Sequence, residues 1–196
     1  MLPALSTSRL AIEHMAPGHA AALADFFRRN ERHLAPWDPP RPAGIMESAF
    51  WQSECERAVE DYEEGAVVRW VLCPREDPHR VIGRVNYTQI ARGPFQSCML
   101  GYAIDADHEG RGLMHEALEA TIEHVFAVLR LHRIQANYVP ENRRSGRLLE
   151  RLGFVHEGRA KNYLYINGAW RDHELTARLN PAFDTSIFSP RPFRPA

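Results

Sequence analysis

Apolar and polar positions change from strand spacing to helix spacing in the first third of the chain. They alternate from Ser8 to Met15, which predicts a half-buried strand. Residues 19–32 repeat apolar side chains at helical spacing and predict an amphipathic helix. Four prolines between Leu34 and Pro42 exclude a helix there and predict a stiff loop. A second helix is predicted from about residue 45 to 64, where a glycine follows.

The middle of the chain carries strand patterns followed by one long helix. Residues 67–73, 81–90 and 96–104 are predicted as strands, and Arg92-Gly93-Pro94-Phe95 is typical of a hairpin turn between the last two. An apolar stripe then predicts a helix from about Leu113 to Leu129. This region therefore supplies the centre of a sheet and a helix that covers it.

The last third contains shorter elements. Residues 133–139 are predicted as a strand, and residues 142–152 as a helix with an asparagine cap and a glycine at its end. Two further strands, 154–162 and 170–179, are joined by a turn near Asn167-Gly168.

This order of elements predicts an α+β domain with a mixed, mainly antiparallel sheet and one parallel region. We expect a single domain over residues 1–180, because no internal repeat or linker divides them. Residues 181–196 form a proline-rich tail without periodicity, which we expect to be extended or loosely packed.

Composition and charge narrow the possible functions. The formal net charge is −1, which argues against nucleic-acid binding through overall charge. Cys55, Cys73 and Cys98 are widely spaced and are expected to be reduced thiols. The start has no charged-then-apolar leader, and no apolar run approaches 18 residues, so we expect a soluble cytoplasmic protein that does not contact membranes. No Cys-x-x-Cys or His-x-x-x-His spacing predicts a metal site, and none is expected.

The most informative stretch is His108-Glu109-Gly110-Arg111-Gly112-Leu113-Met114, which follows an apolar strand and opens the long helix. A glycine turn at this place directs several backbone N–H groups into one hollow, and the helix dipole adds roughly half a positive charge. Such a hollow holds a phosphate or diphosphate without a lysine. An ordinary tight turn is the alternative interpretation.

Two common phosphate-binding motifs do not fit this stretch. A Walker loop needs Gly-Lys-Ser/Thr, but Leu113 follows Gly112. A Rossmann motif needs a third glycine where His115 stands.

The element order and several motifs resemble the GNAT superfamily of acyl-CoA-dependent N-acyltransferases. Gly110 and Gly112 match its Gln/Arg-x-x-Gly-x-Gly/Ala signature, whereas Asp107 departs from the first position. The segments 112–118, 132–138, 140–146, 151–154 and 168–173 look like the ribosomal-protein-alanine N-acetyltransferases of that family, as does the proline-rich loop at 33–39. The resemblance spans about residues 8–179 and implies the GNAT fold, with helices on both faces of the sheet.

The resemblance implies acetyl-CoA as acetyl donor. Its diphosphate would bind the backbone amides of the glycine turn, and its pantetheine arm would pair like an added strand with Tyr102, Ala103 and Ile104, where the family splays two strands apart. The alternative there is a fully paired sheet. The residues implied in cofactor binding are Tyr102, Ala103, Ile104, Glu109, Gly110, Arg111, Gly112, Leu113, Met114, Asn137, Asn142 and Ser145.

Two of these residues have a second interpretation. Asn142 can cap a helix, turn its amide to the pantetheine, or do both. Ser145 matches a serine that lies by the cofactor sulfur in related enzymes, which makes it the candidate catalytic residue that protonates the departing thiolate. An ordinary serine at a helix start is the alternative.

The sequence gives less specific evidence for the residues that line the acceptor channel. Trp37 is a candidate lining residue, with a core anchor as the alternative, and Asn86, Tyr138 and Tyr163 are weaker candidates. Arg171-Asp172 is expected to be an ion pair on a strand surface.

The expected mechanism is direct attack of an amine on acetyl-CoA, because no Cys-His or Ser-His-Asp arrangement supports an acyl-enzyme. The resemblance implies the N-terminal segment of a protein as acceptor, beginning with the alanine of a ribosomal protein. A small amine, such as an antibiotic, polyamine or amino acid, is one alternative. A non-catalytic acetyl-CoA-binding protein is another.

Overall fold

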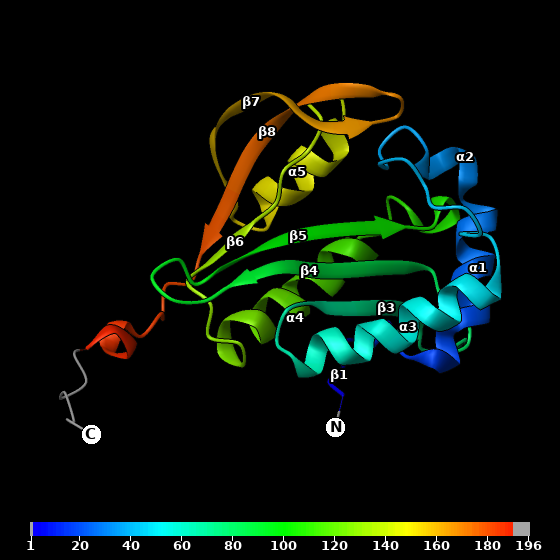
Figure 1. Cartoon of the computed structure of the whole chain (residues 1–196), viewed down its shortest axis with the longest axis horizontal. Helices are drawn as coiled ribbons and strands as arrows, with labels where there is room; N and C mark the ends of the chain where they lie inside the picture. The colour runs from blue at the N-terminus through cyan, green and yellow to red at the C-terminus, as the bar shows by residue number, and fades with distance from the viewer. Residues whose placement is uncertain (1, 190–196) are drawn as a thin grey trace.

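The computed structural model describes residues 2–189 and places them in one sheet covered by helices on both faces (Figure 1). In these residues the strands are β1 (Ala4–Ser6), β2 (Leu10–His14), β3 (Val68–Pro74), β4 (Gly83–Ala91), β5 (Ser97–Ile104), β6 (Arg133–Gln135), β7 (Val155–Ile166) and β8 (Ala169–Leu179). The helices are α1 (Ala20–Arg29), α2 (Glu31–Leu34), α3 (Ser48–Glu63), α4 (Leu113–Ala127) and α5 (Arg143–Arg151), with 3-10 turns η1 (Pro17–His19), η2 (Ala106–His108) and η3 (Thr185–Phe188).

The sheet has the mixed character that the sequence predicts. Its strand order within residues 2–189 is β1-β2-β3-β4-β5-β6-β8-β7. Each neighbouring pair is antiparallel except β5 and β6. A parallel pair needs a crossover, and here the glycine turn and α4 supply it. The glycine turn therefore follows the end of β5, beyond the part of this strand that pairs with β6.

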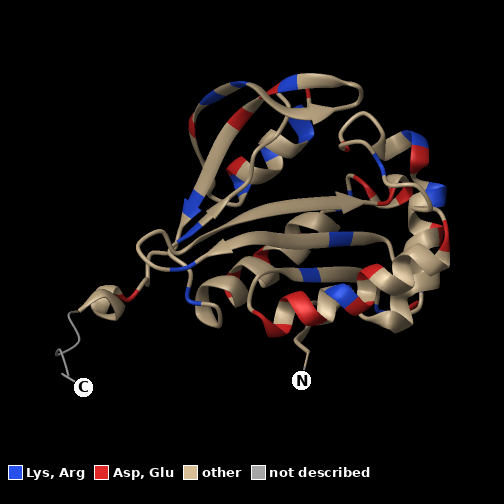
Figure 2. Cartoon of the chain, viewed as in Figure 1, with Lys and Arg blue, Asp and Glu red and all other residues tan. Residues whose placement is uncertain are grey.

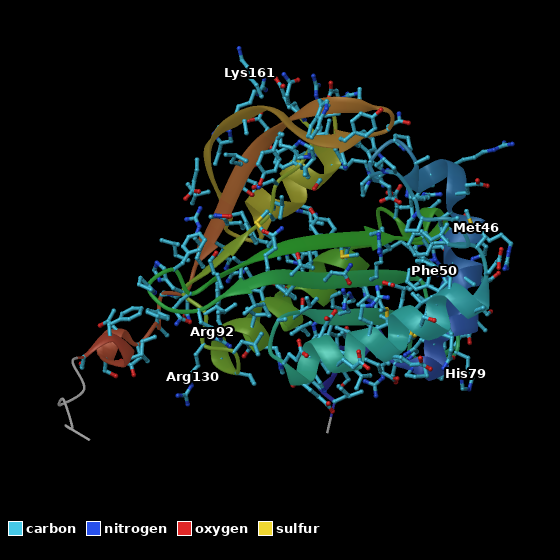
Figure 3. The ribbon with its side chains drawn as sticks, in the orientation of Figure 1. Met46, Phe50, His79, Arg92, Arg130 and Lys161 are labelled. Carbon is cyan, nitrogen blue, oxygen red and sulfur yellow. The ribbon has the colours of Figure 1, made fainter. Side chains whose placement is uncertain are left out.

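Strand β3 separates two hydrophobic cores. Its alternate side chains point to opposite faces, so Trp70 and Leu72 pack with α4 and α5, whereas Val71 packs with α1 and α3. In the second core the Phe27 and Trp51 rings stack at 4.8 Å. Figure 3 labels Met46, which precedes α3, and Phe50 in the first turn of α3, and both pack against this core as partly buried side chains.

Helix α4 is fixed to the central strands by a buried polar contact as well as by its apolar stripe. Tyr87 of β4 is fully buried, and its hydroxyl lies 3.0 Å from the Oγ1 of Thr121 on α4. Such a bond removes the cost of burying an unpaired hydroxyl, about 1–3 kcal/mol. The middle of α4 is thereby held against β4.

The element boundaries differ from the prediction where tertiary contacts decide them. Strand β1 was not predicted. The helix expected over 19–32 ends at Arg29, because the buried Asn30 side chain donates to the Phe26 carbonyl at 2.9 Å and accepts from the Ala106 N–H at 2.9 Å. The strand expected over 133–139 ends at Gln135.

The tail is described only in part. Residues 181–189 contain η3, and the Phe183 ring lies 5.0 Å from that of His132. Residues 190–196 of the predicted tail lie outside the described residues. Among residues 2–189, no helix combines the length and the apolar character needed to cross a membrane.

Candidate active site

A cavity of about 930 Å³ opens where β5 and β6 separate. The two strands pair only between Ser97–Met99 and Arg133–Gln135, although β5 continues to Ile104. The chain after β6 leaves the sheet and leads to α5 instead. The predicted separation of two strands is therefore present, and the last residues of β5 form one wall of the cavity. Its volume suits a ligand the size of a cofactor.

The glycine turn forms another wall at the start of α4. Gly110 has a φ of +73° and Gly112 a φ of +77°, a region that L side chains rarely adopt. Gly112 is the N-cap of α4 and offers no side-chain acceptor, so the first N–H groups of the helix have no cap. Leu113 and Met114 line the cavity beside these groups. The turn thus presents main-chain donors and a helix dipole to the cavity.

A buried carboxylate fixes the beginning of this turn. Asp105 is 2% exposed and accepts hydrogen bonds from the Asp107 N–H at 3.0 Å and from Arg29 Nη2 at 3.0 Å. Burial alone raises a carboxyl pKa, but these hydrogen bonds outweigh it and hold the pKa of Asp105 below its usual value. Asp105 was not among the predicted site residues, and the signal for it in the sequence is an acidic residue directly after an apolar strand.

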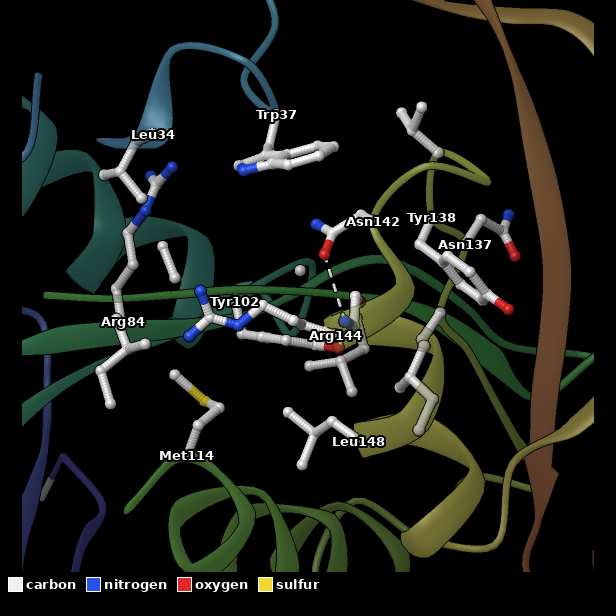
Figure 4. A pocket seen from close by; sticks show the side chains of 18 of the residues that line it. Leu34, Trp37, Arg84, Tyr102, Met114, Asn137, Tyr138, Asn142, Arg144 and Leu148 are labelled. Carbon is white, nitrogen blue, oxygen red and sulfur yellow. Dashed lines mark hydrogen bonds between the residues drawn. The ribbon is translucent and has the colours of Figure 1, made fainter. Parts of the chain in front are cut away.

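Two hydroxyl groups meet across the split in the sheet. The Tyr102 hydroxyl of β5 lies 2.6 Å from the Ser145 hydroxyl of α5. Ser145 is placed by Asn142, whose Oδ1 accepts the Ser145 N–H at 3.1 Å (Figure 4). Asn142 therefore caps α5, one of its two predicted roles, and its Nδ2 donor is not used by the cap. The sequence predicts Tyr102 only as strand backbone and does not predict this role of its hydroxyl.

Aromatic and amide side chains form the wall beneath β7 and β8. The Asn137 side chain donates to the Tyr163 hydroxyl at 3.2 Å and accepts the Thr176 N–H at 3.3 Å. The Tyr138 ring covers Gly146 so closely that a Cβ there would lie 2.7 Å from its hydroxyl oxygen. Asn137 and Tyr138 thus hold α5 and the β7–β8 hairpin together around the cavity.

The loop before α3 covers the cavity from the other side. Trp37 lines the cavity and is 38% exposed, so the alternative of a core anchor is wrong (Figure 4). Glu109 of the glycine turn forms ion pairs with His33 of α2, at 3.2 Å, and with Arg144 of α5. These contacts connect three segments that enclose one space.

The structure brings together almost all predicted site residues. All of them line this cavity except Arg111, whose carbonyl accepts from Arg9 Nη1 at 2.8 Å. Prediction missed the cationic character of the wall, to which Arg84 of β4 and Arg144, Arg147 and Arg151 of α5 contribute. Figure 2 shows blue segments on β4 and α5.

The three cysteines are buried and free, and burial raises the pKa of each to about 12, so they are inert thiols.

The prediction of an ion pair between Arg171 and Asp172 is wrong. Arg171 pairs with Glu141 at 3.0 Å, and Asp172 accepts the Asn162 N–H at 3.0 Å.

A cavity at a split strand pair, with a glycine turn and helix N-terminus at one end, defines an acyl-CoA N-acyltransferase. The model of the acetyltransferase (GNAT) domain matches residues 9–155, and the chain belongs to this family. It is an N-acetyltransferase, similar to the ribosomal protein uS5-alanine N-acetyltransferase of Escherichia coli K12, with 41% identity over 90% of this chain and 91% of that protein.

Solved structures agree with this assignment. The ribosomal-protein-S5-alanine acetyltransferase from Vibrio fischeri is 36% identical, with a TM-score of 0.89 over 93% of this chain and 99% of that chain. Mycobacterium smegmatis RimJ in complex with CoA-disulfide is 27% identical, with a TM-score of 0.81 over 93% of this chain and 84% of that chain.

Proposed function

We propose that this enzyme acetylates the N-terminal α-amine of a protein, and that the acceptor is the N-terminal alanine of ribosomal protein uS5. The observation that carries the proposal is the 41% identity over 90% of the chain to an enzyme with that printed activity. A ribosomal acceptor places the enzyme in the cytoplasm. The acceptor is a protein segment, so neither nucleic acid nor membrane needs to be contacted.

Acetyl-CoA binds along the split in the sheet in this proposal. The diphosphate lies on the amides around Gly110 and Gly112, whose positive φ angles direct them into the cavity. The pantetheine pairs with the edge of β5 at Tyr102–Ile104, which has no neighbouring strand on the β6 side. The thioester then lies between β5 and α5.

The acetyl group passes directly to the amine. The nitrogen attacks the thioester carbonyl carbon, a C–N bond forms, and the C–S bond breaks with its electron pair on sulfur. Ser145, bonded to Tyr102, gives the thiolate a proton, and the proton that the attacking nitrogen loses returns to Ser145 through solvent. A backbone N–H at the free edge of β5 stabilises the carbonyl oxygen. Inert cysteines support this route over an acyl-enzyme.

The protonation state that the attacking amine needs favours an α-amine as acceptor. A peptide α-amine has a pKa of about 7.7–8.0, so making it neutral at pH 7 costs about 1.4 kcal/mol, against about 4.6 kcal/mol for lysine at about 10.4. The carboxylates Asp38 and Glu109 of the cavity wall are already paired with Arg41 and Arg144. An α-amine needs little help from such a base.

Thiol release from acetyl-CoA tests the proposal. A peptide that copies the uS5 N-terminus with a free alanine should be acetylated, and the same peptide with a blocked terminus should not. Isothermal titration should show acetyl-CoA binding in the micromolar range. Turnover with small amines but not with the free peptide would reject the proposed acceptor and leave the family assignment intact.

A further inference from the structure

Arg84 occupies an unusual place on the central strand. It is the only charged residue of β4, between Gly83 and Val85, and is partly buried. Its register partner on β5 is Ala103, so both side chains lie on the face opposite α4. Arg84 therefore reaches the cavity from the side of Leu34 and Trp37 (Figure 4).

The contacts of Arg84 are apolar and aromatic. Its Cζ lies 4.8 Å from the centroid of the Phe27 ring, a cation–π contact. Figure 4 shows its guanidinium beside Leu34, to the left of Trp37. Within residues 2–189, no hydrogen bond or ion pair satisfies the five N–H donors of this group. Burial lowers the pKa of Arg84, as expected for a cation that has lost water, although arginine remains charged.

Three other arginines near the cavity each have a carboxylate partner. Arg29 bonds to Asp105, Arg41 to Asp38, and Arg144 to Glu109. The Asp38 carboxylate is an opposite charge that raises the pKa of Arg84 against the effect of burial, but its ion pair is with Arg41, at 3.1 Å. A partly buried guanidinium that lines a cavity, with no acceptor from the described residues, is available to bind an oxygen of a ligand there.

We propose that Arg84 binds an oxygen of the acceptor chain, a main-chain carbonyl or a side-chain carboxylate within its first few residues. This inference rests on the proposed function, since it needs a peptide in the cavity. The glycine turn lines the same cavity and takes the diphosphate of the cofactor in the proposed function, so the acceptor chain is the ligand left to supply this oxygen.

The same charge also selects against cations. An acceptor with a second ammonium group near its reactive amine, such as a polyamine or a peptide with lysine at its second position, would bring two positive charges together in one cavity. Arg84 therefore favours neutral and acidic alanyl peptides and disfavours polycationic amines.

The test compares Arg84→Ala and Arg84→Met with the parent enzyme on three alanyl tripeptide amides that carry Gly, Glu or Lys at the second position. Arg84→Met keeps the length that packs on Phe27 and serves if the alanine variant does not fold. Arg80→Ala, in the exposed turn before β4, is the matched control. We expect KM for the Gly and Glu peptides to rise about 10- to 100-fold, with KM for acetyl-CoA unchanged.

The pattern of KM values identifies the oxygen. Equal losses for the Gly and Glu peptides assign a main-chain carbonyl, and a larger loss for the Glu peptide assigns a carboxylate. The Lys peptide should gain relative to the Gly peptide in both variants. Unchanged KM values in folded variants, with an active parent enzyme, would overturn the role of Arg84 alone. A parent enzyme that binds acetyl-CoA but acetylates none of the peptides would overturn the proposed function as well.

Discussion

The Tyr102 hydroxyl lies 2.6 Å from the Ser145 hydroxyl and connects β5 to the first turn of α5 across the split in the sheet. Burial raises the pKa of Tyr102 to about 12, although the bond to Ser145 opposes this, so the phenol keeps its proton at neutral pH. Each of the two hydroxyl groups carries one proton, and only one of these protons is used in the hydrogen bond between them. The other proton is therefore free to be donated into the cavity.

Ser145→Ala and Tyr102→Phe should both lower kcat, by about 100-fold or more, because each breaks this donor pair. The double variant should be little worse than either single one, since the two groups act as a unit. Steady-state thiol release measures kcat, and calorimetry should show acetyl-CoA affinity nearly unchanged in Ser145→Ala.

The control for this pair is Tyr165→Phe, which removes a hydroxyl from an exposed ring on β7. It should keep the parent kcat. Parent turnover in Ser145→Ala would remove Ser145 from the role of acid, and strictly additive losses would show that the two hydroxyls act separately.

Gly110→Ala and Gly112→Ala should each destabilise the protein by about 1–2 kcal/mol, because both positions have a positive φ. Both should also weaken acetyl-CoA binding, since relieving this strain turns the amides of the loop away. Denaturant unfolding and calorimetry measure the two effects. Gly18→Ala is the control, because Gly18 lies in η1 without a positive φ and a Cβ there meets nothing within 4 Å. Parent affinity in both loop variants would contradict a diphosphate site here.

The parts of the fold that depend on local sequence patterns were predicted most accurately. The apolar stripe of α4 and the two glycines before it are adjacent in the chain, and the structure places them as expected. Asn142 is similar, because an N-cap is a contact across three residues. The separation of β5 from β6 was predicted only through the family resemblance, because the periodicity of apolar residues does not show where a strand stops pairing with its neighbour.

Contacts between distant segments could not be predicted in this way. Asn30 ends α1 because it bonds to Ala106, 76 residues away, and Tyr102 meets Ser145 over 43 residues. The strand after Arg133 is short because the chain turns away from β5, leaving a single bridge between Tyr138 and Glu174. The residues adjacent to these positions in the sequence contain no pattern that predicts such long-range contacts.

The cysteines should be dispensable for turnover. Cys73 and Cys98 are buried with pKa values of about 12, so very little thiolate exists at neutral pH. Cys73→Ala and Cys98→Ala should keep kcat within about twofold, despite a loss of stability from the smaller side chains. Intact mass after mixing with acetyl-CoA should show no acetylated enzyme. An acetyl adduct on either cysteine that disappears when the peptide is added would contradict direct attack.

The first turn of α4 is also held by a carboxylate, Glu116. It accepts hydrogen bonds from the Arg9 N–H at 3.0 Å, from Arg9 Nε at 2.7 Å and from the Ser8 hydroxyl at 3.1 Å. Burial alone would raise its pKa, but these donors lower the pKa of Glu116 to about 2 from the usual 4.5. Its position near the helix N-terminus adds to the effect.

Because the pKa is lower in the folded state, Glu116 stabilises the protein fully above about pH 4.5, and this contribution is lost as the pH falls towards 2. Glu116→Gln should therefore cost about 1–3 kcal/mol at pH 7 and progressively less in acid. Urea unfolding at pH 7, 5 and 3.5 measures the difference, with Glu123→Gln on the exposed side of α4 as control. A difference that stays constant down to pH 3.5 would show that the loss comes from packing and not from charge.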